Sequence, residues 1–151
     1  MDNDIYSVYF LDNDQSAIDN AIKAVSWNEH GFNIIGSNTD SGKAIQEIID
    51  LKPSLVIYEW RIGGVVLMKK LIEAGAECNF VVLTDCKSVA TVREFFTNGG
   101  FDYLLKPIDT QETETVLNRF RMQNLSGESK ATKAAKKENI ISYARRFSNG
   151  R

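Results

Sequence analysis

The feature that most constrains the fold of this 151-residue chain is a short apolar run, Leu55–Tyr58, that stops at the carboxylate of Glu59. Consecutive apolar residues without alternation are typical of a strand buried on both faces, as in a parallel sheet. In open parallel sheets, functional groups lie just beyond the carboxyl ends of the strands. Glu59 therefore stands where a functional site is expected.

A second apolar run, residues 5–11, ends in the same way, on Asp12, Asn13 and Asp14. The carboxyl ends of neighbouring parallel strands meet at the same edge of a sheet. If these two strands are neighbours, Asp12, Asn13 and Glu59 form one acidic corner.

Helical patterns alternate with the apolar runs along the chain. Within 15–27, Ile18, Ala21, Ile22 and Val25 recur at helical spacing. Asp109 with Glu112 three residues later predicts a capping box at the start of the last helix. The expected strands are 5–11, 32–36, 55–58, 80–83 and 103–105, and the expected helices are 15–27, 41–51, 65–74, 88–97 and one after Asp109. Five such pairs predict an α/β fold with a parallel sheet covered on both faces.

The composition excludes several classes of protein. With 43% hydrophobic and 25% charged residues, the chain has the makeup of an ordinary globular domain with an adequate core. No apolar stretch approaches the roughly 20 residues that span a bilayer, so no membrane association is expected. The acidic first residues do not resemble a signal peptide, and Cys78 and Cys86 show no metal-binding spacing. We therefore expect a reduced, cytoplasmic compartment.

The charge is divided unevenly along the chain. Residues 1–125 hold 11 Lys and Arg against 18 Asp and Glu, whereas residues 126–151 hold 7 against 2. The apolar period ends at 124–129, where Gly, Ser and Glu take over. We expect a domain over 1–125 and a basic linker or tail over 126–151. Within this tail, the spacing of Ile140, Tyr143, Ala144 and Phe147 predicts an amphipathic helix, which would touch nucleic acid or another subunit, or lead to a DNA-binding domain outside this chain.

The residues that follow the strands share one chemistry. Asp12 and Glu59 offer carboxylates, Thr84 offers a hydroxyl and Lys106 offers an ammonium. Carboxylates hold Mg²⁺, whereas a hydroxyl and a Lys hold phosphate oxygens. This rim therefore predicts a site for a phosphoryl group with a divalent cation.

At this point the sequence resembles a known family, the receiver domain of bacterial two-component response regulators, over about residues 5–123. The matching stretches are 10–14, 52–64, 81–84 and 99–107. Residues 27–36 are similar to receivers attached to arabinose-regulator-type DNA-binding domains, and residues 88–107 to receivers of citrate and dicarboxylate regulators. Both classes remain open.

The resemblance implies a flavodoxin-like (βα)5 doubly wound sheet with strand order 2-1-3-4-5. It implies a module of the two-component phosphorelay that regulates transcription and takes a phosphoryl group from a histidine kinase with the help of Mg²⁺. It also implies a homodimer through the fourth helix, fifth strand and fifth helix. DNA would be bound only by an effector domain outside this chain.

Carried over by position, the site departs from the family pattern. The phosphoacceptor Asp falls on Glu59, and no Asp lies anywhere in 51–64. The acidic pair falls on Asp12 and Asn13, and the metal ligands are Asp12, Glu59 and the backbone carbonyl of Arg61. The remaining positions are the phosphate-sensing Thr84, the switch aromatic Tyr103 and the phosphate-binding Lys106. From the residues alone, Tyr103 is equally expected to be a half-buried aromatic of an edge strand, and Trp60 is expected to continue the strand and face away from Glu59.

Two substitutions make an atypical site. Glu is one methylene longer than Asp, and a misplacement of about 1 Å costs about 10²-fold in transfer rate. Asn13 lacks one carboxylate, so the Mg²⁺ site is expected to be weak or absent. We therefore expect Glu59 to be a poor phosphoacceptor. Its longer carboxylate is expected to reach Lys106 and Thr84 directly and to mimic phosphorylation in part, supplying a charge of about −1 instead of up to about −2.

Two other functions remain open, although we do not expect an enzyme. A haloacid-dehalogenase-type phosphatase would use Asp12 as nucleophile and Asp14 as acid/base. The chain lacks the cap insertion and the late acidic pair of that class, and no glycine follows Asp14. A receiver that has lost its chemistry and serves only as a dimerisation module is the other alternative.

Overall fold

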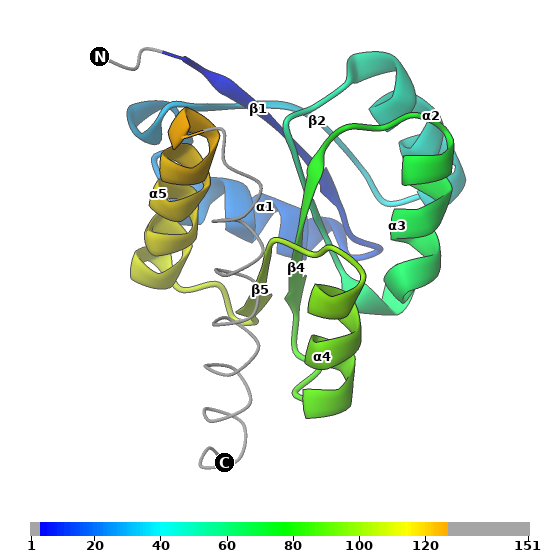
Figure 1. Cartoon of the computed structure of the whole chain (residues 1–151). Coiled ribbons are helices and arrows are strands. Elements are labelled where there is room, and N and C mark those ends of the chain that lie inside the picture. Colours follow the sequence, from blue (N-terminus) through cyan, green and yellow to red (C-terminus); the bar gives the residue numbers. More distant parts are fainter. Residues whose placement is uncertain (1–3, 127–151) are drawn as a thin grey trace.

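A five-stranded parallel sheet forms the centre of the computed structural model, which describes residues 4–126 (Figure 1). The strand order β2-β1-β3-β4-β5 confirms the predicted flavodoxin-like fold. The strands are β1 (Tyr6–Leu11), β2 (Phe32–Asn38), β3 (Leu55–Tyr58), β4 (Asn79–Thr84) and β5 (Asp102–Leu105). The helices are α1 (Gln15–Ala24), α2 (Ser41–Leu51), α3 (Gly64–Glu73), α4 (Val89–Thr97) and α5 (Thr110–Ser126), with 3₁₀ turns η1 (Trp27–His30) and η2 (Trp60–Ile62).

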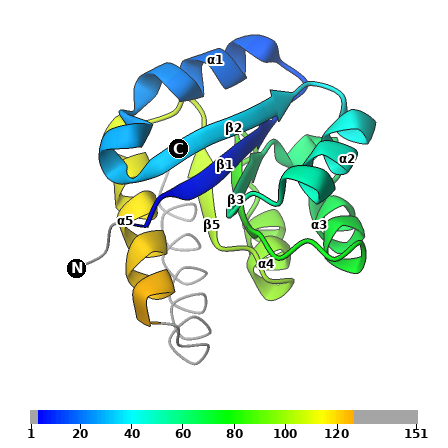
Figure 2. The same cartoon turned by 90° about the horizontal axis from the view of Figure 1, so that it is seen from above.

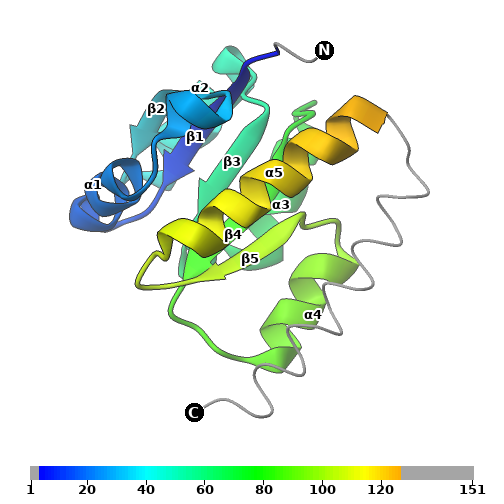
Figure 3. The same ribbon diagram turned by 90° about the vertical axis from the view of Figure 1, so that its left-hand side faces the viewer.

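The helices divide between the two faces of the sheet. Figures 2 and 3 show α1 and α5 on one face and α2, α3 and α4 on the other. Alternate residues of each strand point to opposite faces, so Val8 and Phe10 pack with α1 and α5, while Tyr9 and Leu11 pack with α2 and α3. We call these two halves of the core the α1/α5 layer and the α2–α4 layer.

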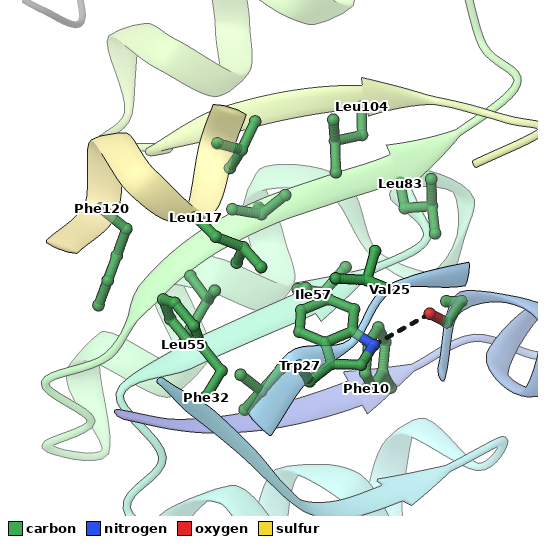
Figure 4. Packing of buried hydrophobic residues seen from close by; sticks show 14 of the residues in the cluster. Phe10, Val25, Trp27, Phe32, Leu55, Ile57, Leu83, Leu104, Leu117 and Phe120 are labelled. Carbon is green, nitrogen blue, oxygen red and sulfur yellow. Dashed lines mark hydrogen bonds between the residues drawn. The ribbon is translucent and has the colours of Figure 1, made fainter. Parts of the chain in front are cut away.

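The α1/α5 layer is built almost entirely from hydrocarbon (Figure 4). The Phe120 ring lies 5.1 to 5.7 Å from the rings of Tyr6, Phe32 and Phe101, within the range of favourable aromatic pairs. Among its polar groups, the Trp27 indole N–H donates to the carbonyl of Ala21 at 3.1 Å, and the fully buried carboxylate of Asp102 pairs with Arg119 of α5.

The α2–α4 layer instead contains three buried tyrosines whose hydroxyls reach acceptors at its rim. Tyr9 donates to Glu47 at 2.5 Å, Tyr58 to the carbonyl of Gly64 at 2.9 Å, and Tyr103 to the carbonyl of Cys86 at 2.8 Å. Burial raises the pKa of all three phenols, so each stays a neutral donor.

The first helix ends earlier than its sequence pattern predicts. It stops at Ala24 instead of Trp27, because Val25 is extended and the indole of Trp27 turns into the α1/α5 layer. The 3₁₀ turn that follows ends at Gly31, whose φ of +84° suits glycine. Packing of one large aromatic side chain here outweighs helical periodicity.

The sequence pattern sets no end for the last helix, which runs through Ser126. Its final turns are tied to the start of the sheet, because Arg121 donates to the carbonyl of Asp4 at 3.0 Å and lies over the ring of Tyr6. The rest of the predicted basic tail lies outside the described residues. In the part of the chain that the structure describes, no helix is both long enough and apolar enough to cross a membrane.

Candidate functional site

Four side chains that follow neighbouring strands meet at the carboxyl edge of the sheet. Parallel pairing aligns Leu11 with Tyr58 and Thr84 with Leu105, so the next residues of β1, β3 and β5 come together beside the end of β4. Asp12, Glu59 and Thr84 are at most 6% exposed. The structure thus brings together Asp12, Glu59, Thr84 and Lys106.

The ammonium of Lys106 lies between the two carboxylates. Its Nζ is 2.8 Å from Asp12 Oδ2 and 2.8 Å from Glu59 Oε1. The peptide bond between Lys106 and Pro107 is cis. Both contacts have the length of charge-assisted hydrogen bonds, so one cation is shared by two anions.

The second oxygen of Glu59 is also bonded. Oε2 accepts a hydrogen bond from Thr84 Oγ1 at 2.5 Å and another from the backbone N–H of Arg61 at 3.0 Å. With Lys106 on Oε1, every carboxylate oxygen of Glu59 has a partner from the protein. The Glu59 side chain is therefore fixed in place.

The electrostatics favour the ionised forms of both partners. Burial raises the pKa of Glu59, but hydrogen bonds from Lys106 and Thr84 lower it more, so the pKa lies below its ordinary value. Burial lowers the pKa of Lys106, but the carboxylates of Asp12 and Glu59 raise it more, so the pKa lies above its ordinary value. The formal charges of Asp12, Glu59 and Lys106 sum to −1.

Tyr103 connects the site to the β4–α4 loop. The residue is fully buried, and its hydroxyl binds the carbonyl of Cys86, whose own N–H donates to Thr84 Oγ1 at 3.3 Å. The sequence left open an inward aromatic or a half-buried residue of an edge strand. Half-burial is wrong here, because α4 covers the edge and places Phe95 5.9 Å from the Tyr103 ring.

The residues after Glu59 turn instead of continuing the strand. Glu59 caps the 3₁₀ turn Trp60–Ile62, so the expectation that Trp60 faces away as part of a strand is wrong. The indole packs edge-on against Phe95 at 6.0 Å. Arg61 forms an ion pair with Asp85, which the sequence analysis did not predict. The sequence feature that could have predicted this ion pair is the position of the two opposite charges, because Arg61 follows β3 and Asp85 follows the neighbouring β4.

The other acidic-corner residues do not join this cluster. Asn13 is exposed, and among residues 4–126 no hydrogen bond links its side chain to Glu59 or Lys106. Asp14 caps α1, accepting from the N–H of Ser16 at 3.0 Å and from its hydroxyl at 2.6 Å. A phosphatase role for Asp14 as acid/base gains no support from this placement.

A divalent metal fits these residues poorly. Mg²⁺ requires an octahedral shell of oxygen ligands, and its affinity depends on the number of charged ligands. Asp12 and Glu59 are both already bonded to Lys106. Within residues 4–126, no group of three or more His, Cys, Asp or Glu side chains is arranged to hold a metal ion.

Comparisons with known proteins show which proteins this chain resembles. No protein-family model matches the chain. The chain is 26% identical over 118 residues to the transcriptional regulatory protein HptR of Staphylococcus aureus, covering 76% of this chain and 46% of HptR. It is 22% identical over 147 residues to the uncharacterized transcriptional regulatory protein YesN of Bacillus subtilis, covering 93% of this chain and 40% of YesN. The chain thus spans less than half the length of both relatives.

A solved structure with the same architecture is the receiver (REC) domain of AraT, a response regulator from Geobacillus stearothermophilus. It matches with a TM-score of 0.72 at 20% identity and covers 82% of this chain and 98% of that domain. The chain therefore has the fold of response-regulator receiver domains.

Proposed function

We propose that this chain is a two-component receiver module whose phosphorylation site is permanently occupied by its own side chain, Glu59. One observation carries the proposal. The Glu59 carboxylate is bonded at once to Lys106 and Thr84, the two residues that the resemblance assigns to the phosphoryl group. Glu59 thus makes, within the protein, the contacts that a phosphoryl group would make.

The same geometry argues against Glu59 as a phosphoacceptor. A nucleophile needs a free oxygen in line with the donor, and a misalignment of about 1 Å costs about 10²-fold. Both oxygens of Glu59 are engaged, and the residue is 4% exposed. The poor fit for a metal removes a further requirement of phosphoryl transfer.

The substitution is expected to act in part only. A carboxylate supplies a charge of about −1, where a phosphoryl group supplies up to about −2. The inward position of Tyr103 and its bond to Cys86 support a site that holds the β4–α4 loop in one conformation. The output would therefore be intermediate and independent of a phosphodonor.

The partners follow from the same proposal. Residues 1–125 would be the receiver and the basic segment 126–151 its connection to an effector domain that binds DNA and regulates transcription. A histidine kinase or another signalling protein would be the upstream partner, in the cytoplasm. The surface of α4, β5 and α5 would form a homodimer.

The direct test is incubation with acetyl phosphate and Mg²⁺, followed by intact-mass measurement. We expect no phosphoryl adduct, whereas a receiver with an Asp acceptor treated in parallel gains one. A stable adduct that disappears in Glu59→Gln would show that Glu59 is phosphorylated and would overturn the proposal.

A second measurement tests the mimicry itself. Glu59→Gln keeps the side-chain length but removes the charge that binds Lys106, so we expect faster hydrogen exchange at the Cys86 amide. Lys87→Gln, which removes an exposed charge from the same loop, is the matched control. Equal exchange in Glu59→Gln and the wild type would mean that the charge of Glu59 does not hold the β4–α4 loop. The domain would then be a purely structural dimerisation module.

A further inference from the structure

The position of Lys106 shows which cation balances the negative charge of the Asp12 and Glu59 carboxylates. Its ammonium is 2.8 Å from a carboxylate after β1 and 2.8 Å from a carboxylate after β3, and its side chain is 23% exposed. A cation that bridges Asp12 and Glu59 is therefore already part of the chain. A second cation would have to share these two carboxylates with the ammonium.

The charges around Lys106 give little electrostatic attraction for a second cation. The shared charge of Asp12, Glu59 and Lys106 is −1, and the neighbouring Asn13 adds none. The two other nearby acids are engaged elsewhere, because Asp14 binds Ser16 and Asp85 binds Arg61. The local charge is thus low for a divalent ion, whose affinity follows the number of charged ligands.

Displacement of Lys106 would also be costly. An ammonium that loses its partners in a largely buried site leaves an uncompensated charge, and breaking such a pair is strongly destabilising. Arg61 does not replace it as counter-ion, because its guanidinium is 4.0 Å from Glu59 Oε2, 59% exposed and paired with Asp85. Lys106 is thus the cation in contact with both carboxylates.

We propose that Lys106 is the resident cation of this site, taking the place that a receiver gives to a divalent metal, so that the site closes without Mg²⁺ and excludes it. This inference rests on the proposed function, since it names the partner that balances Glu59. Asp12, Glu59 and Lys106 form a self-contained set that depends on neither a phosphodonor nor a metal.

The test is a Mg²⁺ titration of the full chain by calorimetry, without any phosphodonor. For the wild type we expect no saturable binding up to about 10 mM, well above the roughly 10⁻³ M dissociation constant of the weakest Ca²⁺ modules. Lys106→Met frees both carboxylates and is expected to bind Mg²⁺ at least tenfold more tightly. Lys23→Met, which removes an exposed positive charge at the end of α1, is the matched control and is expected to behave like the wild type.

A second readout needs no variant. The ¹⁵Nζ resonance of Lys106 in the wild type is expected to keep its position as Mg²⁺ is added. A saturable shift of this resonance, wild-type binding as tight as that of Lys106→Met, or no gain in Lys106→Met would each overturn the proposal. The acetyl phosphate assay is separate, so a chain that binds Mg²⁺ yet takes no phosphoryl group would refute only the role of Lys106.

Discussion

The two layers of the core differ in what lies between the hydrocarbon side chains. In the α1/α5 layer, rings and aliphatic groups contact one another. Two of its polar contacts, from Trp27 to the carbonyl of Ala21 and from Arg119 to Asp102 at the start of β5, do not involve the loops after β3 and β4. In the α2–α4 layer, the hydroxyls of Tyr9, Tyr58 and Tyr103 link the core to α2 and to the loops after β3 and β4.

The α1/α5 layer is held mainly by apolar contacts, whereas the α2–α4 layer also has directed hydrogen bonds to the loops around the site. An apolar contact requires no particular donor or acceptor, whereas each tyrosine bond fixes one donor to one acceptor. Two of the three acceptors, the carbonyls of Gly64 and Cys86, belong to segments next to Glu59 and Thr84. We therefore expect a change at the site to be transmitted through the α2–α4 layer more than through the α1/α5 layer.

The largest expected effect comes from truncating one central ring in each layer. Phe120→Ala removes three ring contacts from the α1/α5 layer, and Phe95→Ala removes contacts with Tyr58, Trp60 and Tyr103 from the other. Each is expected to lower the free energy of unfolding by about 3–5 kcal/mol in urea titrations. Only Phe95→Ala is expected to change the NMR signals of the Tyr103 ring.

Met122→Ala, an exposed truncation on α5, is the control and is expected to stay within about 0.5 kcal/mol of the wild type. If Phe120→Ala changes the NMR signals of the Tyr103 ring as much as Phe95→Ala does, a change in the α1/α5 layer also reaches Tyr103, and the proposed difference between the two layers is wrong.

A smaller effect is expected from removing a single hydroxyl. Tyr103→Phe leaves the carbonyl of Cys86 without its donor and is expected to cost about 0.5–1.5 kcal/mol. Tyr58→Phe, which frees the carbonyl of Gly64, is expected to cost a similar amount. Hydrogen exchange at residues 85–88 separates the two, since only Tyr103→Phe is expected to accelerate it. Equal acceleration in both variants would argue against a specific link from β5 to the β4–α4 loop.

The smallest effect on the free energy of unfolding is expected from pH, which acts through the ionisation of Glu59 and Lys106 at the edge of the sheet and not through the apolar contacts of the α1/α5 layer. The pKa of Glu59 is lowered from 4.5 on folding, so its contribution is present above pH 4.5 and is lost as pH falls through the lower folded pKa. The pKa of Lys106 is raised from 10.5, so its contribution is full below pH 10.5 and is lost as pH rises through the higher folded pKa. Urea midpoints of the wild type and Glu59→Gln are expected to converge below pH 4.5. A constant difference down to pH 2 would contradict this linkage.

Most of the sheet could be predicted because its strands are apolar on both faces. The bounds of α2 and β3 agree with the sequence pattern, since capping residues and the apolar run leave little choice there. The end of α1 and the turn at Trp60 were wrong. In both places the position of a tryptophan is decided by partners distant in the sequence, Phe10 for Trp27 and Phe95 for Trp60.

The candidate site was predictable in its members and, for the reach of Glu59 to Lys106 and Thr84, in two of its bonds. Asp12, Glu59, Thr84 and Lys106 follow directly from being the residues after, or at the end of, parallel strands. The sequence did not show that Lys106 reaches both carboxylates or that Arg61 pairs with Asp85, because these contacts depend on loop geometry and side-chain reach. The proposed roles of these residues await the experiments above.

The attachment of Arg121 to Asp4 and Tyr6 has a consequence for engineering. Because α5 runs back from the site edge to the start of β1, the two ends of the described body lie next to each other, one strand length from Glu59. A short peptide joining them, with new termini opened at the exposed turn near Gly75, gives a circularly permuted domain with the same contacts around Lys106. In that arrangement, a fluorescent or enzymatic module inserted near Gly75 would sit away from the acidic edge.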